Sequence, residues 1–169
     1  MKPVDPRHPL HGLFAELVGD ALSERRLPTD DPAHAYLVDL LIRFSHSDEL
    51  FAVKRAGKPV ESVIEMTAEA DVRLNADSFE REREVHRHIG DTILFWGALY
   101  PDYLRRFKLG GVELVCDYSN QGRESYFIVS TFDYPPYGEE ARTYLQLSEG
   151  FADYSAALTD VSGSLPFSA

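Results

Sequence analysis

The chain has 169 residues, of which 44% are hydrophobic and 27% are charged, and its formal net charge is −11. This composition excludes an intrinsically disordered chain, and the length suits one domain with its own core. The negative charge argues against binding to nucleic acids or anionic membranes, because both recruit Lys and Arg. A single cysteine, Cys116, cannot form an intramolecular disulfide or a cysteine-based zinc site, which favours a reducing compartment.

The beginning of the sequence does not resemble a secretion signal. Residues Met1 to Arg7 are polar and include two prolines, and no apolar signal-peptide core follows them. The longest apolar run, Ile93 to Tyr100, is less than half of the ~20 residues that span a bilayer. We therefore expect a cytoplasmic protein without a membrane contact.

Two helices are predicted in the first part of the chain. Apolar residues at helical spacing predict the first from Pro9 to about Arg25, where the pair Arg25-Arg26 suits a helix end. The second begins with Asp31 as the N-cap and Pro32 in the first turn, and it ends at residues 45–47.

The next segment is harder to interpret. Residues Leu50 to Val53 fit either a short strand or a helical turn, and Gly57 to Pro59 fit a turn. A third helix is predicted from Val60 to about Ala70.

The longest helix is predicted to begin at Asp77 or Ser78 and to end before Pro101, because a proline disfavours helix in the preceding residue. A short helix is predicted to follow at 102–107. Apolar residues at steps of three and four define the expected buried face of the long helix, namely Val85, Ile89, Ile93, Trp96 and Tyr100.

The last third of the chain contains one ambiguous segment. Val112 to Phe132 fits a helix interrupted by Gly122, but also two β runs around Asn120 to Gly122, and we favour the helix because the neighbours are helical. A final helix is predicted from Glu139 to about Leu158. The sequence thus predicts an all-α compact bundle of five or six helices, with a single domain over 1–158 and a loosely held polar tail over 159–169.

Motifs for metal, phosphate and nucleophilic chemistry are absent from the sequence. Glu84 and His88 are four residues apart, as are Glu82 and His86, but one helix then supplies only two ligands. Neither Glu-x-x-His nor a glycine-rich phosphate loop is present, and Cys116 has no evident activating group. We therefore expect no metal and no cofactor, and the balance is against an enzyme.

One polar cluster occurs inside the longest predicted helix. Arg87, His88 and Asp91 are three and four residues apart, so these side chains can meet on one surface, whereas His86 points to the opposite side. A carboxylate beside an imidazole can orient a general base, but such groups also satisfy each other at the edge of a core. We favour the structural interpretation and expect Asp91→Ala to cost about 1–3 kcal/mol if the position is buried.

A wider pattern includes this cluster. It consists of Arg87-His88-Ile89-Gly90-Asp91, Leu94-Phe95, Tyr100-Pro101, Asp117-Tyr118, Gln121-Gly122 and Ser125-Tyr126. Over roughly residues 84–130 the chain resembles a set of small uncharacterised bacterial proteins. The resemblance implies a bacterial origin and a helical fold, but no activity. It also implies that a second segment packs beside the first, with Tyr118, Gln121, Arg123 and Tyr126 as further candidate site residues.

Two hypotheses for function follow. The first is a non-catalytic helical interaction or regulatory module that binds a protein partner or a second copy of itself, because the chain is acidic, rich in tyrosine and without a reaction motif. The second is a small-molecule or enzymatic pocket between the helix of His88 and Asp91 and the segment of Tyr118 and Tyr126. A cavity beside these residues would favour the second hypothesis, and a filled space would disfavour it.

Overall fold

The computed structural model describes residues 7–29, 31–45, 54–55, 58–59, 78–101 and 118–165. Within these ranges the fold has six α-helices, so the predicted all-α bundle is confirmed. Two short strands pair antiparallel, with Lys54 opposite Pro59. The elements are α1 (His11–Glu24), α2 (Pro32–Phe44), β1 (Lys54–Arg55), β2 (Lys58–Pro59), α5 (Phe79–Leu99), α7 (Tyr118–Ser130), α8 (Gly138–Glu149) and α9 (Phe151–Ser164).

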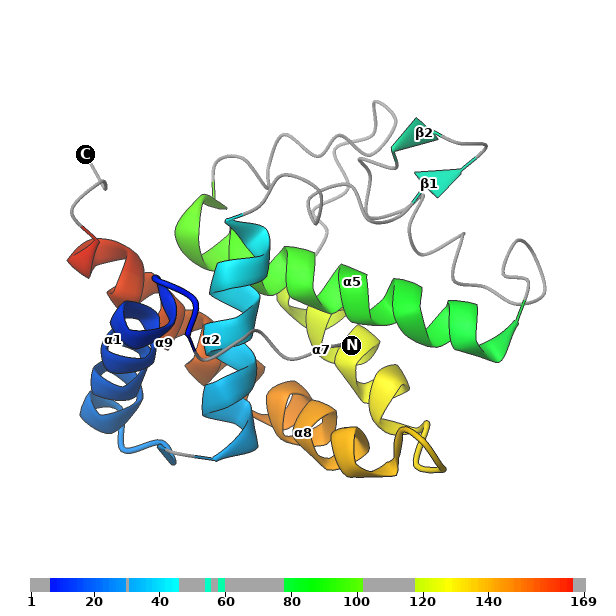
Figure 1. Cartoon of the computed structure of the whole chain (residues 1–169). Helices are drawn as coiled ribbons and strands as arrows, with labels where there is room; N and C mark the ends of the chain where they lie inside the picture. Colours follow the sequence, from blue (N-terminus) through cyan, green and yellow to red (C-terminus); the bar gives the residue numbers. More distant parts are fainter. Residues whose placement is uncertain are drawn as a thin grey trace.

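The long helix α5 is the centre of the arrangement (Figure 1). It packs along α7 on one side and against α9 on another, while α7 also packs on α8. Helix α1 packs on α2 and α9, and α2 makes smaller contacts with α5 and α8. Helix α2 therefore joins the α1 side of the molecule to the layer formed by α5, α7 and α8.

Two predicted helix starts are confirmed by their capping hydrogen bonds. Asp31 Oδ1 accepts a hydrogen bond from the backbone N–H of His34 at 2.9 Å, and Pro32 is the first residue of α2. At α5, Ser78 Oγ accepts from the backbone N–H of Arg81 at 3.1 Å. These caps satisfy backbone donors that a helix leaves unpaired at its first turn.

The core is built from side chains of all six described helices. On the predicted face of α5, Val85, Ile89 and Ile93 are buried, but Tyr100 follows the last helical residue and is 54% exposed. The largest fully buried side chains are Tyr126, Tyr144, Phe151, Leu22, Leu37, Leu40, Ile42, Ile89, Leu94, Leu147 and Leu158.

The prediction of one continuous helix from Glu139 to Leu158 is wrong. The chain forms α8 and α9 instead, and Gly150 separates them with φ −99° and ψ 18°. The turn is tight, because a Cβ at Gly150 would lie 2.8 Å from a ring carbon of Tyr154. The apolar spacing continues across the break because both helices turn their faces to the same core, so Leu147 and Phe151 are both buried.

The last helix also runs further than predicted. Helix α9 ends at Ser164 rather than near Leu158, so the first residues of the expected polar tail are helical. Val161 is buried, Leu165 packs against the core, and Asp160 forms an ion pair with Arg25 of the turn after α1 at 2.8 Å. These contacts are long-range and could not be read from the composition of the tail.

The remaining predictions have mixed outcomes. The helical interpretation of Val112 to Phe132 is confirmed over α7, whereas 112–117 lie outside the described residues. The predictions for 50–53, 60–70 and 102–107 also lie outside them. Over the described ranges, no helix combines the length and the apolar character that crossing a bilayer requires.

Candidate functional site

The most distinctive polar feature is the side chain of Asp91, which is 0% exposed in the middle of α5. Its Oδ1 accepts hydrogen bonds from the hydroxyls of Tyr36 at 2.5 Å and Tyr126 at 2.7 Å. Its Oδ2 accepts from Arg43 Nη1 at 3.0 Å and from Arg87 Nη1 at 3.5 Å. We call these five residues the Asp91 cluster. They come from α2, α5 and α7.

Local geometry explains how three helices reach one carboxylate. Tyr36 and Arg43 are seven residues apart, so they lie two turns apart on one face of α2. Arg87 is one turn before Asp91 on α5. The Tyr126 ring fits against the backbone of Gly90, where a Cβ would approach it to 2.6 Å. Gly90 is therefore required for Tyr126 to reach Asp91.

The charges of the cluster stabilise the ionised carboxylate. Burial alone would raise the pKa of Asp91, but Arg43, Arg87 and the two tyrosine hydroxyls outweigh it, so the pKa lies below its usual value. Burial and the Asp91 charge both raise the pKa of Tyr36 and of Tyr126. At neutral pH the tyrosines are therefore protonated donors, and Asp91 is an anion that only accepts.

Tyr144 of α8 extends the cluster with a third buried ring. Its ring centre lies 5.3 Å from that of Tyr36 in an edge-to-face arrangement and 5.8 Å from that of Tyr126. Burial, followed by the Asp91 charge, raises the pKa of Tyr144 to about 12. Helix α8 is therefore tied to the same polar centre as α2, α5 and α7.

This arrangement identifies Asp91 as an anchor between helices. Both carboxylate oxygens are occupied by protein donors, and the side chain has no exposed surface. A general base must come within hydrogen-bond reach of the proton that it removes. In this geometry Asp91 contacts protein groups, so the cluster fits a structural role better than a catalytic one.

The structure brings only some of the predicted site residues together. Arg87, Asp91 and Tyr126 meet in the cluster. His88 instead stacks on Phe44, with ring centres 6.1 Å apart, and its Nε2 lies 3.4 Å from Thr92 Oγ1. Burial lowers the pKa of His88 to about 4, so this imidazole is neutral at physiological pH.

The predicted residues of the second segment lie along α7 and do not converge on Asp91. Tyr118 is partly buried against the core. Gln121 Nε2 donates to Ser125 Oγ at 3.3 Å, and the exposed Arg123 accepts a bond from Ser148 Oγ at its backbone carbonyl. Of this group, Tyr126 alone has a described bond to Asp91.

His86 lies on the other side of α5, as its spacing from His88 predicted. Its Nδ1 is 3.3 Å from the hydroxyl oxygen of Ser125 on α7, which is fully buried. Burial lowers the pKa of His86 to about 4. The pair crosses the α5–α7 contact, and both side chains are enclosed, so it is part of the packing between these helices.

Sequence reasoning missed Tyr36, Arg43 and Tyr144. One signal was available, because Arg43 lies within the run Leu40-Leu41-Ile42-Arg43-Phe44. An arginine in such a run is buried with its neighbours and then requires an acidic partner. Its side chain is 9% exposed, but the identity of the partner depends on the tertiary arrangement.

Two cavities on the described surface are lined in part by residues of α8. One, of ≈ 230 Å³, is lined by Pro32, Ala35, Tyr36, Asp39, Glu140, Thr143 and Tyr144, and we call it the α2–α8 groove. The other, of ≈ 510 Å³, lies at the start of α8 and is lined by Asp133, Gly138, Glu139 and Arg142. Neither is lined by His88, Asp91, Tyr118 or Arg123. The described residues also include no group of three or more His, Cys, Asp or Glu that could hold a metal ion.

Comparison of the chain with protein-family models, with curated proteins and with solved structures gave no match in any of the three.

Proposed function

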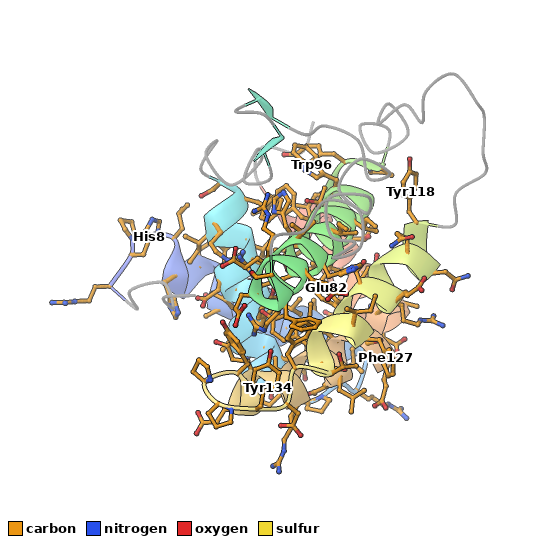
Figure 2. The ribbon with its side chains drawn as sticks, turned by 90° about the vertical axis from the view of Figure 1, so that its right-hand side faces the viewer. His8, Glu82, Trp96, Tyr118, Phe127 and Tyr134 are labelled. Atoms are coloured by element: carbon orange, nitrogen blue, oxygen red, sulfur yellow. The ribbon has the colours of Figure 1, made fainter. Side chains whose placement is uncertain are left out.

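We propose that this protein is a non-catalytic helical module that binds another protein. The observation that carries the proposal is a set of exposed aromatic side chains on α5, on α7 and just after α7. Phe79 is 65% exposed, Phe127 53% and Tyr134 44%. Figure 2, which views the molecule from the right-hand side of Figure 1, labels Phe127 near α7 and Tyr134 lower down. We call Phe79, Phe127 and Tyr134 the aromatic end.

An aromatic ring exposed to water carries apolar surface, and burying that surface against a partner is favourable. Phe and Tyr are enriched in protein interfaces because they bury a large area with few rotatable bonds. Single exposed apolar residues are common, but here three large exposed rings lie at one end of the molecule. Phe79 begins α5, and Figure 1 shows this helix start at the same end as the α7–α8 connection that contains Tyr134.

The aromatic end is attached to an ordered framework. The rings of Tyr134 and Tyr137 lie 5.9 Å apart, and the Arg83 guanidinium is 4.1 Å from the Tyr137 ring centre. Arg83 also donates to Glu140 at 2.6 Å, which ties α5 to α8. A surface held in this way loses little conformational freedom on binding, and that favours affinity.

The Asp91 cluster supports the non-catalytic part of the proposal. Its charged groups are directed at one another, which is what stabilisation of a fold requires. The net charge of −11 makes a basic or neutral partner more favourable than nucleic acid or a second copy of the chain. A cytoplasmic setting and a bacterial origin belong to the same proposal, supported by the single cysteine and by the sequence resemblance over residues 84–130.

The test compares matched surface variants. Phe127→Ser combined with Tyr134→Ser removes two rings of the aromatic end, whereas Leu13→Ser removes an apolar side chain of α1 that is 42% exposed. Quantitative affinity capture from the source cell, followed by cross-linking, should find a partner that wild type and Leu13→Ser retain. The double variant should lose it by about tenfold or more, which corresponds to ~1.4 kcal/mol.

Native mass spectrometry of the same proteins separates self-association from binding to a partner. A dimer that the double variant abolishes would identify a second copy as the occupant. Equal capture by all three proteins would contradict the assignment of this surface.

A further inference from the structure

We propose that Arg43 holds a small free oxyanion, a carboxylate or a phosphate, on the edge of its guanidinium formed by Nε and Nη2. We call these two nitrogens the Arg43 edge. Arg43 is 8% exposed, yet within the described part of the chain neither nitrogen has a hydrogen-bond partner. The inference goes beyond the proposed function, because it concerns a ligand of the helix framework rather than a partner at the aromatic end.

The rest of the Arg43 guanidinium is fixed by the protein. Its Nη1 donates to Asp91 Oδ2 at 3.0 Å, and its central carbon lies 5.6 Å from the centre of the Tyr36 ring. That ring is itself tied to Asp91 through the Tyr36 hydroxyl. The Arg43 edge is therefore already oriented, so a ligand that binds there does not have to order the side chain.

Asp91 has no acceptor position left for the Arg43 edge. An ionised carboxylate offers about four such positions. The Asp91 oxygens already accept from Tyr36, Tyr126, Arg43 Nη1 and Arg87. One negative charge is thus shared between two guanidinium groups. A buried donor without an acceptor destabilises a fold, so the Arg43 edge calls for an acceptor from outside the cluster.

A comparison with Arg83 of α5 favours an anion over an ordered water at Arg43. Arg83 is also buried, and its Nε likewise has no partner among the described residues. Its Nη2 donates to Glu140 at 2.6 Å, so one carboxylate faces one cation there, and a neutral water completes such an arrangement. At Arg43 two cations share one carboxylate. A negative ligand gains Coulomb energy at that position, and burial strengthens the attraction.

The shape of the Arg43 edge selects the class of anion. The N–H bonds of Nε and Nη2 in an arginine point in nearly the same direction, so they match two oxygens of one carboxylate or phosphate. Chloride cannot form this paired arrangement, because it is a single atom. Since Arg43 is almost completely enclosed, the ligand is small, of the size of acetate or inorganic phosphate.

The experiment follows the arginine Nε–Hε signals of the ¹⁵N-labelled full chain by NMR. The probes are sodium acetate and sodium phosphate, with sodium chloride at the same ionic strength. We expect the Arg43 signal to shift and to saturate with acetate or phosphate, whereas the Arg83 signal stays in place. Chloride should act at least about tenfold more weakly, because it cannot bridge the two nitrogens.

A matched pair of variants tests the site through stability. Arg43→Lys keeps the positive charge but lacks the paired nitrogens, so the saturable rise in Tm that acetate or phosphate gives to wild type should disappear. Arg25→Lys changes an arginine whose side chain is 38% exposed, and it should keep the full rise. If Arg43→Lys does not fold, the comparison of the Arg43 and Arg83 signals in wild type decides alone.

Four outcomes would overturn the inference. They are an Arg43 signal that does not saturate with either oxyanion, equal shifts of the Arg43 and Arg83 signals, chloride acting as strongly as acetate, or a full rise in Tm in folded Arg43→Lys. The third outcome would identify screening of charge in place of a bound oxyanion. Phe127→Ser combined with Tyr134→Ser should leave the anion response intact, so this inference and the proposed function fail separately.

Discussion

The contact between α5 and α7 and the contact between α2 and α8 use small residues to opposite effect. At α5–α7, Gly90 faces the Tyr126 ring, and Gly122 faces Phe151 and Ile93, so aromatic and branched side chains fill the space that each glycine leaves. At α2–α8, Ala35 and Thr143 are among the residues that line a groove of ≈ 230 Å³. Tyrosines border both contacts. Only at α5–α7 does a further helix, α9, place a side chain against the glycine, namely Phe151.

This difference separates polar groups that are enclosed from polar groups that border a groove. Asp91, His86 and Ser125 lie in or beside the filled contact, where burial directs them to one another. Asp39 and Glu140 line the open contact, and Glu140 is paired there with Arg83. The geometry of the cluster that stands out in the sequence therefore fits a structural role, whereas the less conspicuous acids line an open groove.

The largest change in stability is expected when the buried carboxylate at the filled contact is removed. Asp91→Ala leaves the buried Arg43 and two tyrosine hydroxyls without their acceptor. We therefore expect a loss of about 3–5 kcal/mol in the free energy of unfolding. This exceeds the 1–3 kcal/mol inferred from the sequence, because the side chain is fully buried and bonded to three helices. Denaturant melts measure the loss, with the exposed Glu124→Ala as the control. A loss below about 1 kcal/mol would show that the cluster is not an anchor.

The second effect concerns the two buried histidines of α5 and appears when the pH is lowered. His86 and His88 have pKa values near 4 when folded, compared with a usual value of 6.5, because burial disfavours their charged forms. Between these values the unfolded chain binds protons that the folded chain does not, so stability falls as pH decreases from 6.5 to 4. Each histidine should contribute about 1–3 kcal/mol over this range.

Melts at closely spaced pH values would measure this slope. The double variant His86→Gln and His88→Gln should flatten it, while the stabilisation from Asp91, whose pKa is lowered, is lost only at lower pH. An unchanged slope in the double variant would mean that these histidines are not buried as neutral groups.

A third prediction tests the filled contact by adding one methyl group. Gly90→Ala forces Cβ against the Tyr126 ring, so we expect a loss of about 1–3 kcal/mol despite the higher helix propensity of alanine. Gly12→Ala is the matched control on α1, because nothing lies within 4 Å of its added Cβ, and it should be neutral or stabilising. Thermal melts of both variants decide. Equal effects would mean that α5 and α7 can separate at little cost.

The smallest expected effect comes from adding atoms to the open contact. Ala35→Leu places a larger side chain where α2 borders the groove, so the free energy of unfolding should change by less than ~0.5 kcal/mol. A loss of stability comparable to that of Gly90→Ala would show that the groove is closed in solution.

The fold was largely predictable because its signals are local. The Asp31-Pro32 cap, Ser78 and the apolar spacing of α5 each act within one or two turns of chain. The prediction failed at Gly150, where helical spacing continues through a change of direction. Spacing reports which face is buried, but it does not show whether two successive helices share one axis.

The site was predictable only in part. Asp91 and Arg87 are neighbours on one helix, and their bond follows from spacing, whereas Tyr36 and Arg43 reach Asp91 from another helix. The groove could not be predicted, because it depends on how α2 and α8 lie against each other. Local patterns do not encode this relative placement.

The Asp91 carboxylate also has a consequence for how the protein opens. It bonds residues that lie 35, 48 and 55 positions away from it in the chain, and it thereby joins α5 to α2 and α7. None of these helices can detach alone without leaving an ion or a hydroxyl unpaired away from water. Fluctuations that would otherwise release α2 by itself are thereby converted into a concerted opening of all three helices. Amide protons in the middle of α2, α5 and α7 should therefore exchange with solvent at one shared free energy, close to that of global unfolding.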